Sequence, residues 1–249
     1  MMKKIVLCVG ATLVAASFSV AAEEINVAVA ANFTAPIKEI AAMYEKESGN
    51  KILASFGATG QFYAQIKNGA PYEILFAADA KTPKKIVEEG LGVDAAPYAF
   101  GKLVLWSATP DFVKHEPSFI LSDKVQKIAV ANPKLAPYGE AAYQTMEKWG
   151  NFEAAKAKFV TGDNIGKTFQ YAKTSNAQVG FVALSQVYKD GKFTSGSGWI
   201  IPADCYKPIR QDSVILNPGK GKKAVADFMK FMKSEQVRKV IDSYGYSTK

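Results

Sequence analysis

Short apolar segments of strand character alternate along this chain with longer segments of helical period. Ile25, Val27 and Val29 occupy alternate positions as in a short strand, and residues 37–44 carry apolar side chains at the i, i+3, i+4, i+7 spacing of a helix that Gly49 closes. The same order recurs in residues 52–56 and 61–68, and in 74–78 followed by a helix whose first turn holds Pro83. This alternation predicts an α/β fold with mostly parallel sheets flanked by helices.

The second half of the chain repeats the pattern and then returns to helices. Strands are expected at residues 103–107, 127–131, 159–161, 179–184 and 212–216, and two amphipathic helices end the chain. We expect two lobes that share a hinge instead of two domains joined end to end. The expected division is 23–102 for the first part of lobe 1, 103–209 for lobe 2 and 210–249 for the return to lobe 1.

Residues 1–22 have the composition of a secretory signal peptide. Lys3 and Lys4 precede an apolar run over residues 5–16, and small residues follow up to Ala21 and Ala22, either of which fits the cleavage rule. The run is shorter than the ~20 residues that span a membrane, although an uncleaved anchor stays an alternative. The segment therefore predicts export to the periplasm.

Net charge and cysteine count limit which ligands, macromolecular partners and disulfides are expected. Removal of Lys3 and Lys4 from the 31 basic residues leaves 29 against 23 acidic residues, a net charge of +6 that favours the approach of anions. The lysines are scattered, so we expect no nucleic-acid partner. Only Cys205 remains after cleavage, which excludes an intrachain disulfide in the mature chain.

Four strand-to-helix junctions carry small or polar residues where a helix begins. Backbone N–H groups at such helix starts, aided by the helix dipole, bind anions without a formal charge. Three of the junctions also fit ordinary N-capping, by Asn32 or Thr34, by Thr59 and by Asn164. Two junctions lie in each half of the chain, so closure of the lobes would bring all four onto one ligand. The junctions are Ala31-Asn32-Phe33-Thr34, Gly57-Ala58-Thr59-Gly60, Ala136-Pro137-Tyr138-Gly139 and Asp163-Asn164-Ile165-Gly166.

The chemistry of these junctions favours a fully deprotonated oxyanion. Molybdate, tungstate and sulfate only accept hydrogen bonds, so a cage of neutral N–H and O–H donors suits them. A protonated phosphate also needs an acceptor, and Asp163 is the one acid within the four junctions. Phosphate therefore stays a lesser alternative.

Several longer segments resemble the bacterial molybdate-binding proteins of molybdate ABC transporters over nearly the whole mature chain. The matching segments are VAVAANFTAPI, SFGATGQFYAQIKNGAPYEILFAADAKTP, YAFGKLVLWSA, ANPKLAPYGEAA, VGFVALSQV and the terminal YGY. The resemblance implies a two-lobed, type II periplasmic-binding fold with the oxyanion in the cleft between the lobes. It also implies a monomeric binding protein without cofactor that delivers molybdate or tungstate to a membrane ABC transporter permease.

The resemblance assigns the ligand contacts position by position. The metal of the anion is held only through its oxygens, by backbone N–H groups and hydroxyls at Ala31, Asn32, Ala58, Thr59, Tyr138 and Ile165. Many members carry serine at the positions of Asn32 and Thr59, and some supply a tyrosine hydroxyl where this chain has Ala183. The number of donors is therefore expected to be smaller here, or to be restored by Asn32.

Three alternatives stay open from the sequence. An enzyme is disfavoured because His115 is the only histidine and neither a G-x-S-x-G nor an H-E-x-x-H motif occurs. A ferric-ion binder of the same fold would use neighbouring tyrosines, for which Tyr244 and Tyr246 are the candidates. A binder of sulfate, thiosulfate or another small anion would share the same backbone donors, and sequence does not separate these ligands.

Overall fold

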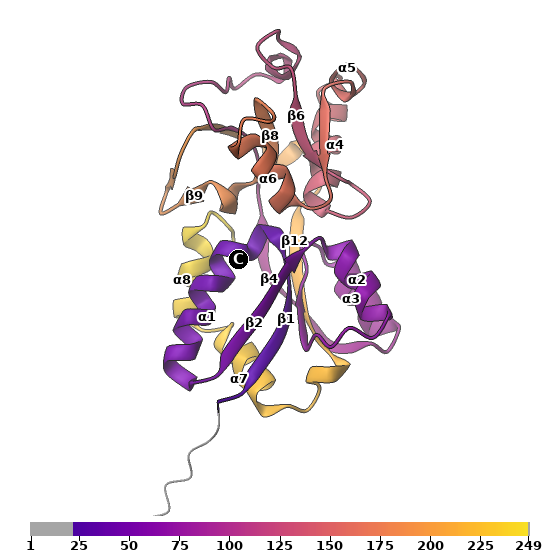
Figure 1. Ribbon diagram of the computed structural model, residues 1–249, viewed down its shortest axis with the longest axis vertical. Helices are drawn as coiled ribbons and strands as arrows, with labels where there is room; N and C mark the ends of the chain where they lie inside the picture. Colours follow the sequence, from indigo (N-terminus) through magenta and orange to yellow (C-terminus); the bar gives the residue numbers. More distant parts are fainter. Residues whose placement is uncertain (1–21, 249) are drawn as a thin grey trace, which may run out of the picture.

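The computed structural model describes residues 22–248, and Figure 1 shows two α/β bodies stacked along the long axis. Each body is built on a five-stranded sheet, and a small two-stranded sheet lies beside them. The expected signal peptide lies, apart from Ala22, outside the described residues. The α/β fold class with helices on both faces of two sheets is confirmed.

The first sheet has the strand order β2-β1-β3-β12-β4. Strands β1, β2 and β3 run parallel, while β12 is antiparallel to both of its neighbours, β3 and β4. The strands are β1 (Glu24–Ala30), β2 (Lys51–Gly57), β3 (Ile74–Phe76), β4 (Gly92–Gly101) and β12 (Ile209–Leu216). The helices of this body are α1 (Thr34–Ser48), α2 (Thr59–Lys67), α3 (Lys81–Glu88), α7 (Lys223–Phe231) and α8 (Glu235–Ser243).

Helices cover both faces of this sheet, which is why β1 is apolar along most of its length. Alternate β1 residues pack against α1, α7 and α8 on one face, and Ala28 packs with Phe62 and Ile66 of α2 and Ile86 of α3 on the other. Figure 1 shows the same division, with α1 and α8 on one side of the strands and α2 and α3 on the opposite side.

The second sheet has the order β11-β5-β8-β6-β7, in which β6, β7 and β8 are parallel and β5 and β11 add antiparallel pairs. Its strands are β5 (Leu103–Ser107), β6 (Ile128–Ala131), β7 (Phe159–Gly162), β8 (Val179–Ala183) and β11 (Ser197–Ile200). Helices α4 (Pro137–Lys148), α5 (Phe152–Lys156) and α6 (Ile165–Lys173) flank it. The short elements are η1 (Ala31–Phe33), η2 (Pro117–Leu121), η3 (Leu184–Gln186), η4 (Ala203–Cys205), η5 (Asn217–Gly219), β9 (Tyr188–Lys189) and β10 (Lys192–Phe193).

The chain passes between the two sheets where β4 leads into β5 and again between β11 and β12. The first sheet takes its strands from residues 24–101 and 209–216, and the second from residues 103–200. The lobe boundaries at 102 and 209 stay a proposal, because a boundary between rigid lobes is defined by their relative motion.

Strand β4 is the long strand that the sequence pattern does not predict. It contains Pro97, and Asp94 has a left-handed φ of 57°. Register shifts interrupt its pairing with β12. β4 is an edge strand, where proline and irregular backbone are tolerated because one row of N–H and C=O groups needs no partner strand. Its irregular sequence hides it from a search for apolar alternation.

Replacement of Phe228 by alanine tests the first core. Phe228 on α7 is fully buried, and its ring lies 4.9 Å from that of Tyr44. We expect Phe228→Ala to lower the free energy of unfolding by about 3–5 kcal/mol, measured by urea denaturation. As a matched control, Phe56 is 38% exposed, and Phe56→Ala should cost about 1 kcal/mol or less. Equal losses for the two variants would contradict this account of the core.

Candidate functional site

The four junctions singled out in the sequence meet between the two sheets. The N–H of Gly60 donates to the carbonyl of Leu135, just before α4, at 3.0 Å. A Cβ added to Gly166 would lie 3.2 Å from the Cβ of Ala31, so the starts of η1 and α6 also touch. The six residues proposed from the sequence are all buried: Ala31, Asn32, Ala58, Thr59, Tyr138 and Ile165.

At three of the four helix starts the N-cap side chain accepts no hydrogen bond, although at α2 Oε1 of Gln61 accepts from the N–H of Ala58 at 3.2 Å. Their N-cap residues are Ala30, Ala58 and Ala136, none of which has a side-chain acceptor. Only Asn164 caps its helix, through a hydrogen bond that Oδ1 accepts from the N–H of Lys167 at 2.9 Å. Ordinary capping is therefore correct for Asn164 and wrong for Asn32 and Thr59, whose side chains make other contacts.

The uncapped starts leave specific backbone donors without an intrahelical partner. At α4, Pro137 has no N–H, and the N–H groups of Gly139 and Glu140 donate to the carbonyl of Ala136. Tyr138 therefore supplies the single N–H of that first turn that remains for another acceptor. Such N–H groups at the positive end of a helix dipole favour an anion.

Thr59 adds a hydroxyl to these backbone groups. Its Oγ1 accepts a hydrogen bond from the N–H of Ala78 at 2.9 Å. A hydroxyl has one hydrogen to donate in addition to its acceptor capacity. The oxygen of Thr59 is therefore fixed by the backbone of the first body, while its hydrogen is available to a ligand.

A buried polar network surrounds Asn32 and reaches into the second body. The Nδ2 of Asn32 donates to Oε1 of Gln211 and to the hydroxyl of Tyr246, both at 2.8 Å. The hydroxyl of Ser185 donates to the Asn32 carbonyl at 2.7 Å, and Gln211 Nε2 donates to the hydroxyl of Tyr138 at 3.0 Å. The network thus joins η1, β12, the C-terminal segment, η3 and α4.

One atom of this network lacks a partner. Asn32 Oδ1 is buried and accepts no hydrogen bond within residues 22–248. A buried acceptor without a hydrogen-bond partner lowers the stability of a fold by about 1–3 kcal/mol. Some other interaction must therefore hold the amide of Asn32 in this orientation.

Gln211, Ser185 and Tyr246 belong to this network, and the sequence pattern predicts none of them as parts of the site. Gln211 is fully buried within β12, yet the sequence pattern placed the start of that strand at residue 212. Gln211 stands between Arg210 and Asp212 in the polar first half of β12, so its local sequence gives no sign that it is buried. Nothing in the sequence pairs Asn32 with Tyr246, which lies 214 residues further along the chain.

The tyrosines proposed for a ferric site do not act as a pair. The hydroxyl of Tyr244 donates to Glu39 at 2.9 Å, whereas the hydroxyl of Tyr246 contacts Asn32 and Ser185. Burial raises the pKa of each phenol to about 12, which disfavours the phenolate that iron requires. Residues 22–248 also contain no group of three or more His, Cys, Asp or Glu side chains arranged to hold a metal ion.

The acid of the fourth junction does not enter the buried site. Asp163 is exposed, and its side chain forms no ion pair or hydrogen bond with the rest of the described chain. The Asp163 carboxylate, the acceptor that a protonated phosphate would need, therefore makes no hydrogen bond to the six proposed residues.

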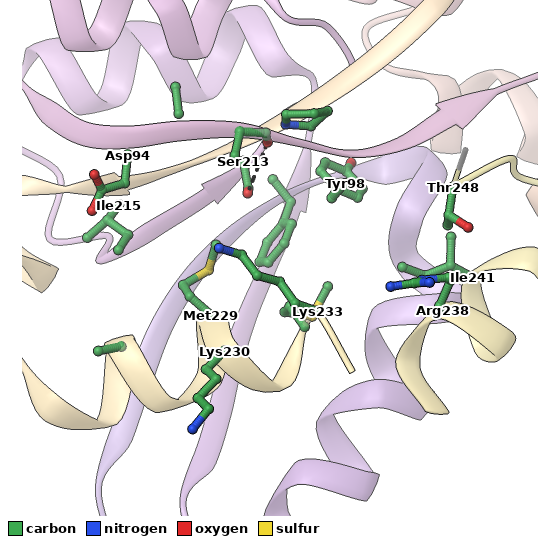
Figure 2. A pocket seen from close by; sticks show the side chains of 16 residues that line it. Asp94, Tyr98, Ser213, Ile215, Met229, Lys230, Lys233, Arg238, Ile241 and Thr248 are labelled. Atoms are coloured by element: carbon green, nitrogen blue, oxygen red, sulfur yellow. Dashed lines mark hydrogen bonds between the residues drawn. The ribbon is translucent and has the colours of Figure 1, made fainter. Parts of the chain in front are cut away.

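A groove of another kind lies on the first body. It measures about 670 Å³ and is bounded by β4 and β12 on one side and by α7 and α8 on the other (Figure 2). Its cations, Lys230, Lys233 and Arg238, are exposed, and none of the four junctions contributes to its lining. This groove is therefore separate from the buried donors.

Comparison with known proteins places the chain in a family. Residues 25–247 match the model of the family described as "Bacterial extracellular solute-binding protein". The molybdate-binding protein ModA of Azotobacter vinelandii is 49% identical over 247 residues, covering 98% of this chain and 97% of that protein. ModA of Rhodobacter capsulatus is 46% identical over 231 residues, covering 92% of this chain and 90% of that protein.

A solved structure shows the same fold. The periplasmic molybdate-binding protein of Azotobacter vinelandii superposes with a TM-score of 0.86 at 35% identity, covering 90% of this chain and 98% of that chain. No helix among the described residues is both long and apolar enough to cross a membrane.

A charged contact also joins the two bodies at a distance from the network. Lys189 of β9 donates to Glu39 of α1 at 2.9 Å and to the hydroxyl of Ser243 in α8 at 2.8 Å. The same ammonium lies 3.9 Å from the ring centroid of Tyr244. In Figure 1, β9 accordingly lies beside the ends of α1 and α8.

This contact should make stability depend on pH. Partial burial acts to raise the pKa of Glu39, but hydrogen bonds from Lys189 and Tyr244 outweigh it and hold the pKa below its ordinary value of 4.5. A carboxyl whose folded pKa is depressed stabilises the fold above its unfolded pKa, and the contribution is lost as pH falls through the folded pKa.

We therefore expect Glu39→Gln to lower the free energy of unfolding at neutral pH, and the difference from wild type to vanish as pH falls below 4.5. Glu39 is 41% exposed in its side chain, so solvent screening limits the loss to about 1 kcal/mol or less. Glu45 on the same helix is exposed and forms no ion pair within residues 22–248, so Glu45→Gln is the control. A difference that persists in acid would show that Glu39 acts through packing.

Proposed function

The chain belongs to the bacterial extracellular solute-binding proteins, and on that premise we propose that it captures molybdate, and tungstate with it, and delivers it to a membrane ABC transporter. The observation that carries this proposal is the meeting of four helix starts, three of them uncapped, in one buried place. The names of the relatives, which are molybdate-binding proteins, support the same ligand. A binding protein of this kind performs no covalent chemistry.

The proposed ligand contacts come from both bodies. Backbone N–H groups with the Thr59 hydroxyl hold the oxygens of the anion, so the metal itself has no protein ligand. Donors without a carboxylate suit molybdate, because an anion without protons has nothing to donate. The contacts we propose are Ala31, Asn32, Ala58, Thr59, Tyr138 and Ile165.

Capture would proceed by closure of two lobes. An anion that bridges donors of both lobes binds the closed arrangement better than the open one, and that difference shifts the population toward the closed form. The lobes would divide at residues 102 and 209. The closed form is the one that the permease would recognise.

The cellular setting belongs to the same proposal. The signal-peptide composition of residues 1–22 and the family support export to the periplasm, where the mature protein would work as a monomer. The net charge of +6 after cleavage would favour the approach of anions, and no nucleic acid is a partner.

Calorimetric titration of the purified, ligand-stripped mature protein tests the ligand. We expect tight one-to-one binding of molybdate and tungstate, and little response to sulfate or hydrogen phosphate at the same concentration. Sulfate, thiosulfate or phosphate as the strongest ligand would keep the fold and overturn molybdate. A titration in which none of these anions binds would overturn the proposed function.

Thr59 provides a test of one contact. Thr59→Val removes the hydroxyl hydrogen and should weaken molybdate binding by about 1.5–3 kcal/mol, the range for a hydrogen bond to a charged group. Valine also leaves the N–H of Ala78 without its acceptor, so the unfolding free energy of the ligand-free variant must be measured separately. Thr59→Ser keeps both hydrogen bonds and is the matched control. Equal affinities of the valine and serine variants would remove the Thr59 hydroxyl from the site.

A further inference from the structure

The side chain of Asn32 is oriented so that it offers no hydrogen-bond donor to an anion. Its Nδ2, the only donor of the amide, is used by Gln211 and Tyr246 at 2.8 Å each. The arm that has no partner within residues 22–248 is Oδ1, which only accepts. An anion without protons cannot donate to Oδ1, so this orientation gives molybdate no hydrogen bond from the side chain.

Gln211 is what holds the amide in this orientation. Its Oε1 accepts from Asn32 Nδ2 at 2.8 Å and from the hydroxyl of Tyr98 at 2.9 Å, and its Nε2 donates to the hydroxyl of Tyr138 at 3.0 Å. A half-turn of an amide exchanges its oxygen and nitrogen with almost no change in shape. A half-turn of Asn32 alone would place two acceptor oxygens against each other.

A half-turn of both amides avoids that conflict. Gln211 Nε2 would then donate to Asn32 Oδ1 and to the hydroxyl of Tyr98, whose single hydrogen would go to the carbonyl of Ala77, 2.9 Å away. The hydroxyl of Tyr138 would donate to Gln211 Oε1, and the hydroxyl of Tyr246 would donate to Asn32 Oδ1. Every member of the network retains a partner, and Asn32 Nδ2 becomes free to donate.

We propose that Gln211 is a positioning residue for the anion site, whose amide turns together with that of Asn32 when a deprotonated oxyanion binds, so that Asn32 presents Nδ2 to it. This inference rests on the proposed function. The long-range contact between β12 and η1 then has a role in binding, because Gln211 determines whether Nδ2 or Oδ1 of Asn32 faces the ligand. The unturned pair presents Oδ1 instead, the arm that suits an oxyanion carrying a proton.

Gln211→Glu tests the inference because a carboxylate only accepts. Asn32, Tyr98 and Tyr138 would all donate to Glu at this position, and Asn32 would be fixed with Oδ1 toward the ligand. The added charge repels any dianion, so the readout is the ratio of molybdate to hydrogen phosphate affinity at mildly alkaline pH, where both carry two negative charges. We expect this ratio to fall at least about tenfold relative to wild type. Gln170→Glu adds a charge at an exposed position of α6 and should leave the ratio unchanged.

A second measurement covers a variant that fails to fold or a hydrogen phosphate affinity below detection. In the isotope-labelled wild-type protein, nuclear Overhauser contacts of the Gln211 Nε2 protons should change from the Tyr138 ring to the Tyr98 ring when molybdate is added. Contacts that stay with Tyr138 in the molybdate complex, or a ratio unchanged by Gln211→Glu, would overturn the inference. Failure of wild type to bind molybdate would instead overturn the proposed function.

Discussion

The first N–H groups of a helix have no partner inside the helix, and the proposed anion site of this protein depends on that property. A soluble helix usually compensates with a side-chain cap, as Asn164 does for α6. Alanine at the N-cap of three junctions removes this compensation where the two bodies meet. The unpaired donors are buried there, and buried donors must find an acceptor. These donors thus favour the binding of an anion, although none of the six proposed contact residues is a cation.

The close approach of these helix starts depends on small residues. Gly139 lies so near β6 that an added Cβ would stand 2.3 Å from the carbonyl oxygen of Ala131, which no side chain tolerates. Gly60 and Gly166 similarly admit Leu135 and Ala31 from the opposite body. The same turns that free the N–H groups therefore also let the two bodies approach closely enough to share one small ligand.

The sequence predicts much of the fold and only part of the site, for a physical reason. The apolar residues Ile25, Val27 and Val29 of β1 and the helical period of α7 and α8 follow from local burial, and the structure buries these strand residues and the apolar helix faces. Strand β4 escapes because an edge strand tolerates Pro97. The four junctions are local features and can be located in the sequence. Asn32 contacts residues that lie 153 to 214 positions further along the chain, and no local period encodes such contacts.

The use of uncharged donors also affects how the bound anion is released. A cation buried in the cleft would hold an anion in the open protein as well, because one lobe alone would supply the full charge. Backbone dipoles divided between two lobes act differently, because opening removes a large part of the donors at once and lets water replace them. Affinity is then coupled to the distance between the lobes. A transporter that separates the lobes would therefore release the anion without any chemical change in the protein.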